Sequence, residues 1–437
     1  MPPPRGGESG GANRNQGSVM TLRNLLASSS MVAFSAAPLL AQQGPVDPVM
    51  FDGGYEALQP LSGSAGPAEL EGHGQGYYVP STPETVQWGY LPNRDSEPVL
   101  TVPSGSVVTF DTLSHEGLLE DQGRDPEVYF AGFEVTRDFV LDDAVEITGS
   151  DIAHDFAVDG PHIVTGPIAI EGAEPGDILK IETLSIIPRT GYGVISNRHG
   201  KGALPGEFPE TPVPAADASA ENPEAYHNVS VFTPISERDG QYYGALHTAE
   251  GERVEFPIRP FMGLMGVASD TSEPVHSVPP AMHGGNLDIN ELGAGSTLYL
   301  PIEVAGALFY TGDPHAAQGD GEVALTALEH SMRPTFRLTV LKPGDEGLPM
   351  SGDIAHPMAE TEDYWIAIGL NEDLDEAMKE AVRQSIGLLT GRYGMDRATA
   401  LAYLSAGVDF EVSQVVDKTK GVHALIPKAD FSALAVD

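Results

Sequence analysis

The chain has 437 residues, 41% of them hydrophobic, so it is long enough for two or three domains with a sizeable core. It carries 63 acidic residues against 23 Lys and Arg residues, and this net charge of -40 argues against the basic face that nucleic acid or an anionic membrane surface requires. It contains no cysteine, which excludes disulfides, a thiolate nucleophile and Cys-ligated zinc.

Residues 1–41 have the composition of a disordered start followed by a targeting segment, and translation starts at either Met1 or Met20. Beyond Met20, a short stretch with Arg23 is followed by an apolar run that ends in small residues near Ala41. This pattern is typical of a cleaved secretory signal. We therefore expect a periplasmic or secreted protein with no stable insertion in the membrane.

Residues 42–76 are rich in Gly, Ser and Pro without periodicity, which predicts a linker. Residues 77–345 contain strand-like runs at short spacing between Pro and Gly turns, such as Ser106–Phe110 and Ile178–Glu182. Repeated strands of this kind predict a β-sandwich or barrel-like core rather than alternating βαβ units. Within this core, residues 187–260 show few regular elements and predict a long loop.

Residues 346–437 change character and predict a smaller α+β portion with two helices and a hairpin. Asn371 is expected to cap the first helix, whose first turn is acidic, and Asp396–Ala406 is expected to be the second helix. Two strand-like runs, Val408–Val416 and Val422–Pro427, form the predicted hairpin. The expected fold class is therefore α+β, mainly β.

The stretch richest in candidate chemistry begins with a long apolar run. Leu298–Phe309 suits one buried strand, and the loop after it holds Asp313, His315, Asp320 and Glu322. Residues two apart in extended chain face the same way, which pairs the first two of these side chains and also the last two. Carboxylate and imidazole groups together suit a divalent metal, although Asp and Gly in loops are also common turn formers.

Six further side chains are candidates for ligands, acids or bases. On spacing alone, each is also explained by a structural role. They are Asn286 and Asp288 on a Gly-rich turn, His115 after a strand-like run, His162 and Glu171 near a Pro–Gly turn, and His423 on the predicted hairpin.

The motifs GGNLD, GSTLYLPIEVAGALF and GDPHAAQGDGEV resemble those of the acetamidase/formamidase family, which hydrolyses short amides to carboxylate and ammonia. Further motifs, HIVTGPIAIEGAEPGD, RPFMGLMGVA and VVDKTKGVHALIPK, extend the resemblance from Pro98 to Lys428. The resemblance implies a β-rich fold with a smaller α+β portion and a bound metal. It also implies that His162 occupies a family position.

The first hypothesis for function is a metal-dependent amidohydrolase that acts on a small amide. The chain has neither a cysteine nor a G-x-S-x-G motif, so a metal-activated water is the natural route to hydrolysis. We expect one divalent ion, zinc or alternatively calcium, held by Asp288, His315 and a carboxylate from Asp313 or Asp320.

The remaining roles follow from this hypothesis. Glu322 is the expected general base, with Glu171 as the next candidate. Asn286 is expected to donate to the developing oxyanion, and His162 to orient the substrate or act as the acid. His115 and His423 are further site candidates. The second hypothesis is an exported β-rich protein that binds metal or ligand without turnover, and in either case we expect a homo-oligomer.

Overall fold

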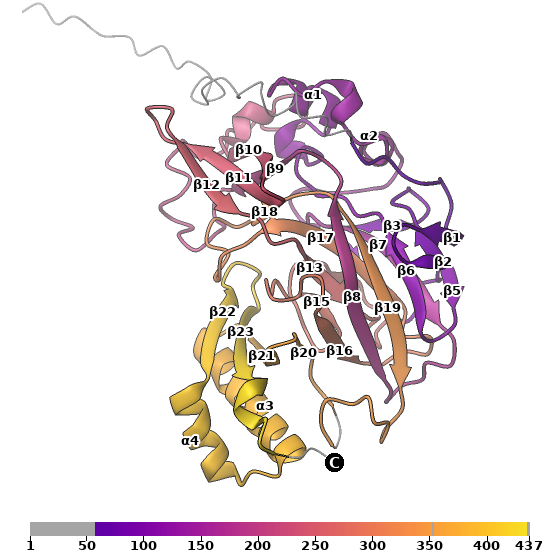
Figure 1. Cartoon of the computed structure of the whole chain (residues 1–437). Helices are drawn as coiled ribbons and strands as arrows, with labels where there is room; N and C mark the ends of the chain where they lie inside the picture. The colour runs from indigo at the N-terminus through magenta and orange to yellow at the C-terminus, as the bar shows by residue number, and fades with distance from the viewer. Residues whose placement is uncertain (1–56, 352–353, 435–437) are drawn as a thin grey trace, which may run out of the picture. The chain divides into compact units, whose positions relative to one another are not determined.

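The chain is built on two large, mainly antiparallel sheets that share one core (Figure 1). The computed structural model describes residues 57–351 and 354–434, all within one compact unit, Gly44–Asp437. The predicted secretory signal, residues 1–41, lies outside the described residues. Among the helices that are described, none combines the length and apolarity needed to cross a bilayer.

The first sheet has ten strands and runs from an N-terminal hairpin to a C-terminal hairpin. Its longest pairing joins β8 to β19. In spatial order the strands are β1 (Gly66–Leu70), β2 (Gly74–Val79), β6 (Ser106–Phe110), β19 (Met332–Leu341), β8 (Ile178–Pro188), β16 (Thr297–Pro301), β20 (Met358–Glu360), β21 (Tyr364–Asn371), β23 (Lys420–Pro427) and β22 (Asp409–Gln414).

The second sheet has eleven strands. A path of eight strands is joined through β17 to a branch of three, in which β7 is the middle strand. The path consists of β12 (Arg253–Pro257), β11 (Gln241–His247), β10 (Val229–Arg238), β9 (Tyr192–Asn197), β18 (Leu328–Glu329), β17 (Phe309–Ala317), β13 (Phe261–Gly266) and β15 (Gly284–Asn286). The branch consists of β7 (Ile163–Ile170), β3 (Val86–Trp88) and β5 (Leu100–Val102).

The remaining elements are short or lie on the sheets. A two-stranded ribbon and four helices complete the described structure, together with short 3-10 turns. The elements are β4 (Tyr90–Leu91), β14 (Val275–His276), α1 (Pro126–Ala131), α2 (Asp142–Thr148), α3 (Leu374–Tyr393) and α4 (Arg397–Gly407). In Figure 1, α3 and α4 lie with the C-terminal hairpin, and α3 packs on β21 and β23.

Aromatic side chains join the two sheets at the centre of the core. Phe110 and Phe336 come from the first sheet and Phe309 from the second, and all three are fully buried. Their ring centroids lie 5.7 Å (Phe110–Phe309), 6.0 Å (Phe110–Phe336) and 5.6 Å (Phe309–Phe336) apart in edge-to-face contacts. Edge-to-face packing stabilises aromatic pairs beyond the area that they bury. The mainly β architecture predicted from the sequence is therefore confirmed.

The C-terminal portion contains the two helices and the hairpin that the sequence predicts, with one error in capping. Asp373, not Asn371, caps α3, because its carboxylate accepts from the backbone N–H groups of Asp375 and Glu376. The boundary predicted after residue 345 falls within one sheet, since β16 pairs with β20.

Two segments that the sequence analysis leaves without regular structure form strands. Part of the predicted linker, residues 42–76, forms the β1–β2 hairpin at the edge of the first sheet. Gly76 is needed there, because a Cβ would lie 2.6 Å from the backbone oxygen of Val107. The predicted long loop, residues 187–260, contains all of β9, β10, β11 and β12. Both segments were predicted to lack strands because they are rich in glycine and proline.

The predicted single strand Leu298–Phe309 is also wrong. It is divided between β16 in the first sheet and β17 in the second by a tight turn. In this turn Gly306, Ala307 and Leu308 all have positive φ, of 82°, 59° and 55°. An apolar run does not reveal such a change of sheet, because both strands are apolar and largely buried, and only Glu303 and Ala305 in the connection are exposed.

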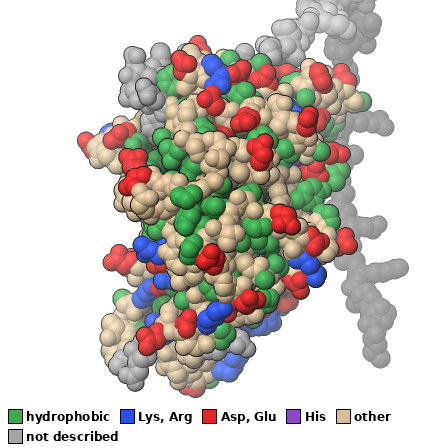
Figure 2. Space-filling model, turned by 90° about the vertical axis from the view of Figure 1, so that its right-hand side faces the viewer, with side chains coloured by type: hydrophobic (Ala, Val, Ile, Leu, Met, Phe, Trp, Pro, Cys, Tyr) green, Lys and Arg blue, Asp and Glu red, His purple; other side chains and the backbone are tan. Residues whose placement is uncertain are grey.

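Acidic side chains dominate the charged surface. Figure 2 shows Asp and Glu spread among hydrophobic and neutral side chains over the face on the right-hand side of Figure 1. On this face the acidic side chains are therefore spread out and form no single patch.

Candidate active site

Nine polar side chains from distant parts of the chain converge beside β17. Strand β17 supplies two of them, and the others come from β15, β18 and from the segments that flank β6, β7, β15, β17 and β22. All nine are buried, with at most 7% of each residue exposed. We call them the central cluster: His115, His162, Asn286, Asp288, Asp313, His315, Glu322, Glu329 and Asp417.

His315 lies at the middle of this cluster. Its Nε2 lies 3.0 Å from Asp313 Oδ2 and 3.2 Å from Glu329 Oε1. Its Nδ1 lies 3.0 Å from Gln318 Oε1 and 3.8 Å from Asp288 Oδ1. The prediction that Asp313 and His315 face the same way is therefore confirmed, and the Gln318 contact holds the orientation of the ring.

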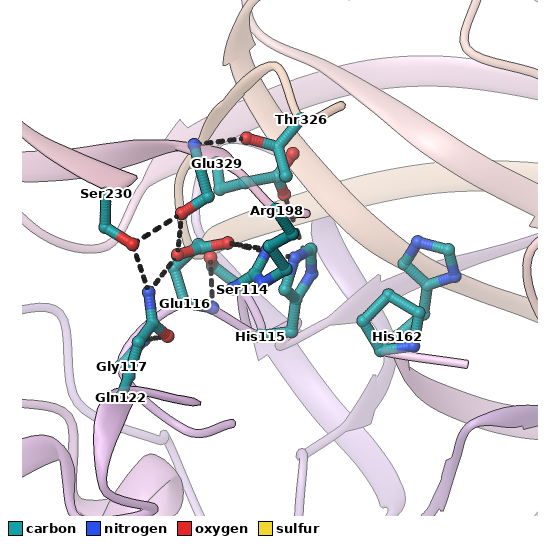
Figure 3. A network of polar contacts seen from close by, with 12 residues as sticks. Ser114, His115, Glu116, Gly117, Gln122, His162, Arg198, Ser230, Thr326 and Glu329 are labelled. Atoms are coloured by element: carbon teal, nitrogen blue, oxygen red, sulfur yellow. Dashed lines mark hydrogen bonds and ion pairs between the residues drawn. The ribbon is translucent and has the colours of Figure 1, made fainter. Parts of the chain in front are cut away.

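Two histidines lie on the other side of Asp313. His115 Nδ1 is 3.7 Å and His162 Nε2 is 3.6 Å from Asp313 Oδ1, and the two rings meet edge to face (Figure 3). The Nδ1 atom of His162 lies 3.0 Å from Ser277 Oγ, which directs Nε2 toward Asp313. Burial lowers the pKa of His162 to about 4.

A polar network holds His115 from behind. Glu116 Oε1 lies 3.3 Å from His115 Nε2 and accepts from Arg198 Nη1 at 2.9 Å. Arg198 Nε also donates to Asp121 at 2.7 Å, and Ser196 donates to Glu116 at 2.6 Å. Figure 3 shows His115, Glu116 and Arg198 together with Gln122, which also contacts Glu116. Burial acts to raise the pKa of Glu116, but Arg198 and His115 lower it below its usual range. Glu116 is thus a fixed anion that orients His115.

The backbone of the central cluster is strained. Asp288, Asp313 and Glu322 have φ values of 51°, 48° and 46°, in the left-handed region that residues with a side chain adopt rarely. Such strain is concentrated at functional sites, where the surrounding structure maintains it. Positive φ is thus found at the acidic residues themselves as well as at neighbouring glycines such as Gly285 and Gly321.

Gly263 on β13 completes the cluster by leaving space. A Cβ at this position would lie 2.5 Å from Asp288 Oδ1, 2.8 Å from His315 Cε1 and 2.9 Å from Asp313 Oδ2. No positive φ requires a glycine here, so the reason is the close approach of the three side chains. The backbone of Gly263 therefore forms one wall of the space between these side chains.

The carboxylates are crowded enough to perturb one another. Burial, followed by the charge of Glu322, raises the pKa of Asp288 well above its usual range. Burial and the charge of Asp417 do the same to Glu322. Burial raises the pKa of Asp417 to about 7. A cation placed among these oxygens would relieve their repulsion.

Several atoms of the cluster have no hydrogen-bond partner among the described residues. They include Asp288 Oδ1, Asp313 Oδ1, Glu329 Oε2 and both ring nitrogens of His115. Two sets of three ligand atoms lie within 4.8 Å of one another and share Asp313: Asp288–Asp313–His315 and His115–His162–Asp313. Buried, unpartnered carboxylate and imidazole atoms at this spacing fit a divalent metal such as zinc.

The cluster opens into a pocket of about 430 Å³. Asp313, Glu322 and Glu329 line its inner part, together with His115 and His162. Cations also line the pocket: Arg198, which is buried, and Lys201 and Lys418, which are exposed. The volume falls in the range of small-molecule sites.

Seven of the ten candidates from the sequence belong to the central cluster, and three do not. Glu171 is exposed in the turn after β7. Asp320 is exposed and accepts from Asn290, and His423 is buried on β23 beside Glu291. The alternation expected for Asp320 and Glu322 fails because both lie in a turn, not in extended chain. His423 lies on the hairpin as predicted, but its side chain points toward Glu291 and not into the central cluster.

Asn286 is in the cluster with a different function from the one expected. Its Nδ2 donates to Asp288 Oδ2 at 2.7 Å and to Asp417 Oδ2 at 3.1 Å. Both amide protons are therefore committed to carboxylates, which argues against donation to an oxyanion.

The sequence analysis missed Asp417 and Glu329. Asp417 lies within the VVDKTKG motif, which was the available signal, and no comparable pattern marks Glu329.

The sequence of the chain matches a known family. The chain belongs to the acetamidase/formamidase family, whose profile matches residues 136–273 and 271–433. The formamidase of Methylophilus methylotrophus is 27% identical over 299 residues, which cover 59% of this chain and 73% of that protein. The acetamidase of Mycolicibacterium smegmatis is 30% identical over 198 residues, 37% of this chain and 49% of that protein, so this chain matches only about half of its length.

Solved structures share the architecture. An acetamidase from Bacillus halodurans superimposes with a TM-score of 0.61 and 25% identity, covering 82% of this chain and 100% of that one. An acetamidase from Yersinia enterocolitica has a TM-score of 0.60 and 23% identity, covering 81% and 93%. The second likeness shows the fold alone.

Proposed function

We propose that this chain hydrolyses the carbon–nitrogen bond of small linear amides, giving a carboxylate and ammonia. The observation that carries the proposal is the central cluster, a set of buried acids and histidines with unpartnered atoms facing a small-molecule pocket. Membership of the acetamidase/formamidase family supports this type of reaction. A hydrolase of this kind needs an activated water, a base and a group that polarises the carbonyl.

We propose that Asp288, Asp313 and His315 hold a divalent ion, zinc in the first instance and calcium as the alternative. These residues are the ones predicted from the sequence, with Asp313 in preference to Asp320 because only Asp313 has oxygens near the other two. When bound, such an ion supplies Lewis-acid chemistry, polarising a carbonyl oxygen and making a water molecule nucleophilic. The cradle formed by Gly263 leaves room among the three side chains.

Glu322 is the proposed general base. It is buried, lines the pocket and lies in the same group of carboxylates as Asp288 and Asp417. Its carboxylate takes the proton of the attacking water and passes it to the leaving nitrogen. His162 is proposed to orient the substrate. Its Nδ1 contacts Ser277, so its Nε2 points toward Asp313.

The pocket also supports a site for the carboxylate product. Lys201 and Lys418 line the pocket and are exposed. An ammonium group at this position attracts a carboxylate as it leaves.

Export and self-association remain part of the proposal. The signal-like stretch after Met20 supports a periplasmic or secreted protein. N-terminal sequencing of the periplasmic or secreted fraction is expected to give a start near Gln42, and an intact Met1 in the cytosol would contradict export. Sedimentation or light scattering of the same material is expected to show a homo-oligomer.

The test of the activity is ammonia release. The purified protein is incubated with formamide, acetamide, propionamide and butyramide in buffer containing zinc, and then in buffer containing a chelator. We expect ammonia from at least one amide in the first buffer and none in the second. If folded, zinc-loaded protein releases no ammonia from the series, the second hypothesis holds, namely a binding protein without turnover.

A further inference from the structure

A second cluster of acids and histidine lies apart from the central cluster, around the C-terminal hairpin. We call it the hairpin cluster: Glu291, Asp320, Glu411 and His423. Glu411 is on β22 and His423 on β23, whereas Glu291 lies between β15 and β16 and Asp320 follows β17. Two of these residues are the ones that the sequence analysis assigned to the active site.

The side chains of Glu291, Glu411 and His423 are close enough to bind one metal ion together. His423 Nε2 lies 3.1 Å from Glu291 Oε2 and 3.6 Å from Glu411 Oε2. One ligand atom from each of the three lies within 4.8 Å of the others. The Asp320 carboxyl interacts with that of Glu411 and extends the group to a fourth donor.

His423 is oriented toward the acids from within the core. Its side chain is 0% exposed, and its Nδ1 lies 2.8 Å from Ser413 Oγ. This contact fixes the ring, as outer hydrogen bonds do for metal-ligating histidines. The opposite nitrogen, Nε2, and Glu291 Oε2 have no hydrogen-bond partner among the described residues. A buried imidazole nitrogen that makes no hydrogen bond thus faces two carboxylates, at 3.1 and 3.6 Å.

The charges of the cluster require a positive partner. Carboxylates accept hydrogen bonds only, and the nitrogen that faces them carries a lone pair unless it is protonated. The ion pairs recorded for Glu291 and Glu411 are both made to His423. Either a proton on the ring or a metal ion can supply the missing charge. One imidazole with two or three carboxylates is a donor set that suits zinc and related divalent ions.

We propose that the hairpin cluster is a second divalent-metal site, separate from the active site, in which His423, Glu291 and Glu411 are ligands and Asp320 is a fourth donor. A metal there joins the β22–β23 hairpin to two segments of the core. The backbone already makes one such connection, since Gly321 N donates to Ser413 O at 3.1 Å. The same hairpin carries Asp417 into the central cluster, so the metal fixes the segment that delivers this carboxylate.

The test measures metal content independently of activity. Full-length processed protein is loaded with zinc, dialysed against metal-free buffer and analysed for bound zinc per chain. The variant Glu291→Gln is expected to bind one zinc fewer than the parent, as is His423→Ala. Glu291→Gln is the safer change, because this residue is partly exposed and the substitution preserves its shape. Glu362→Gln, on the exposed turn between β20 and β21, makes the same charge change and is expected to retain all zinc.

A second measurement isolates the hairpin cluster from the active site. In Asp313→Asn, whose central cluster is impaired, zinc is still expected to bind at one site and to raise the melting temperature. In Asp313→Asn/Glu291→Gln this rise is expected to disappear. Equal zinc content in the parent, Glu291→Gln and His423→Ala would overturn the proposal and leave a protonated His423 paired with the two acids. A zinc-induced rise that persists in the double variant would overturn it as well.

Discussion

The central cluster and the hairpin cluster contain the same kinds of side chain in different surroundings. In the central cluster Asp313 is 3% exposed and three acids have positive φ. In the hairpin cluster the side chains of Glu291 and Glu411 are 18% and 32% exposed, and neither residue has positive φ. The central cluster faces a pocket of about 430 Å³, and a second pocket of about 400 Å³ is lined by Asp320 of the hairpin cluster and by Glu322. The comparison teaches that the same residue types occur in both clusters, whereas deeper burial and positive φ set the proposed active site apart.

The largest expected effect comes from Asp313, which two of the possible ligand sets in the central cluster share. Asp313→Asn is expected to lose the active-site metal and activity together, because loss even of an outer partner costs about 10–100-fold in metal affinity. Metal analysis and ammonia release measure both outcomes. Glu171→Gln is the control, and this exposed variant is expected to keep both. Full activity in folded Asp313→Asn would contradict the assignment of this residue.

The next effect concerns Glu322. Glu322→Gln preserves the shape of the side chain and removes the base, so kcat is expected to fall by about 10²–10⁴-fold, or roughly 3–5 kcal/mol of barrier. The active-site metal is expected to remain. A fall of less than tenfold in folded, metal-loaded protein would remove Glu322 from the mechanism, and simultaneous loss of metal would make it a ligand.

Gly263→Ala tests the space within the central cluster. The added Cβ would lie 2.5 Å from Asp288 Oδ1, so it must displace the ligands. A displacement on the order of 1 Å is expected to lower kcat/KM by roughly 10²-fold. The control is Gly387→Ala on α3, where a Cβ meets nothing within 4 Å. It is expected to keep its activity and to gain about 0.5–1 kcal/mol of stability, measured by urea unfolding. Equal activity in the two variants would show that the cradle is unimportant.

The smallest expected effect is the change in unfolding free energy when Glu411 of the hairpin cluster is replaced in buffer that contains a chelator. Without metal, Glu411 contributes a partly exposed ion pair to His423, and Glu411→Gln is expected to cost about 0.2–1 kcal/mol of unfolding free energy. With zinc the cost is expected to be larger, because the variant loses a ligand. Urea unfolding in the two buffers measures the difference. The same small cost in both would place the hairpin cluster with ordinary surface ion pairs.

The sequence predicted the fold class and the core of the site because both depend on local patterns. The segment after β15 and the strand β17 supply Asp288, Asp313 and His315. Asp313 and His315 meet as the spacing predicts, although Asp313 has a φ of 48° and is not in extended conformation. The same reasoning failed for Asp320, where a turn replaces the strand. Glu329 could not be found, because it reaches His315 only through the pairing of β18 with β17. Sequence spacing carries no information about such a register.

The turn of the β22–β23 hairpin provides Asp417 to a pocket that His115 lines from a distant part of the sequence. During synthesis Asp417 therefore leaves the ribosome long after His115. Contacts between residues so far apart in sequence are generally slow to form in folding. A chain cut before Asp417 accordingly lacks one of the carboxylates of this pocket.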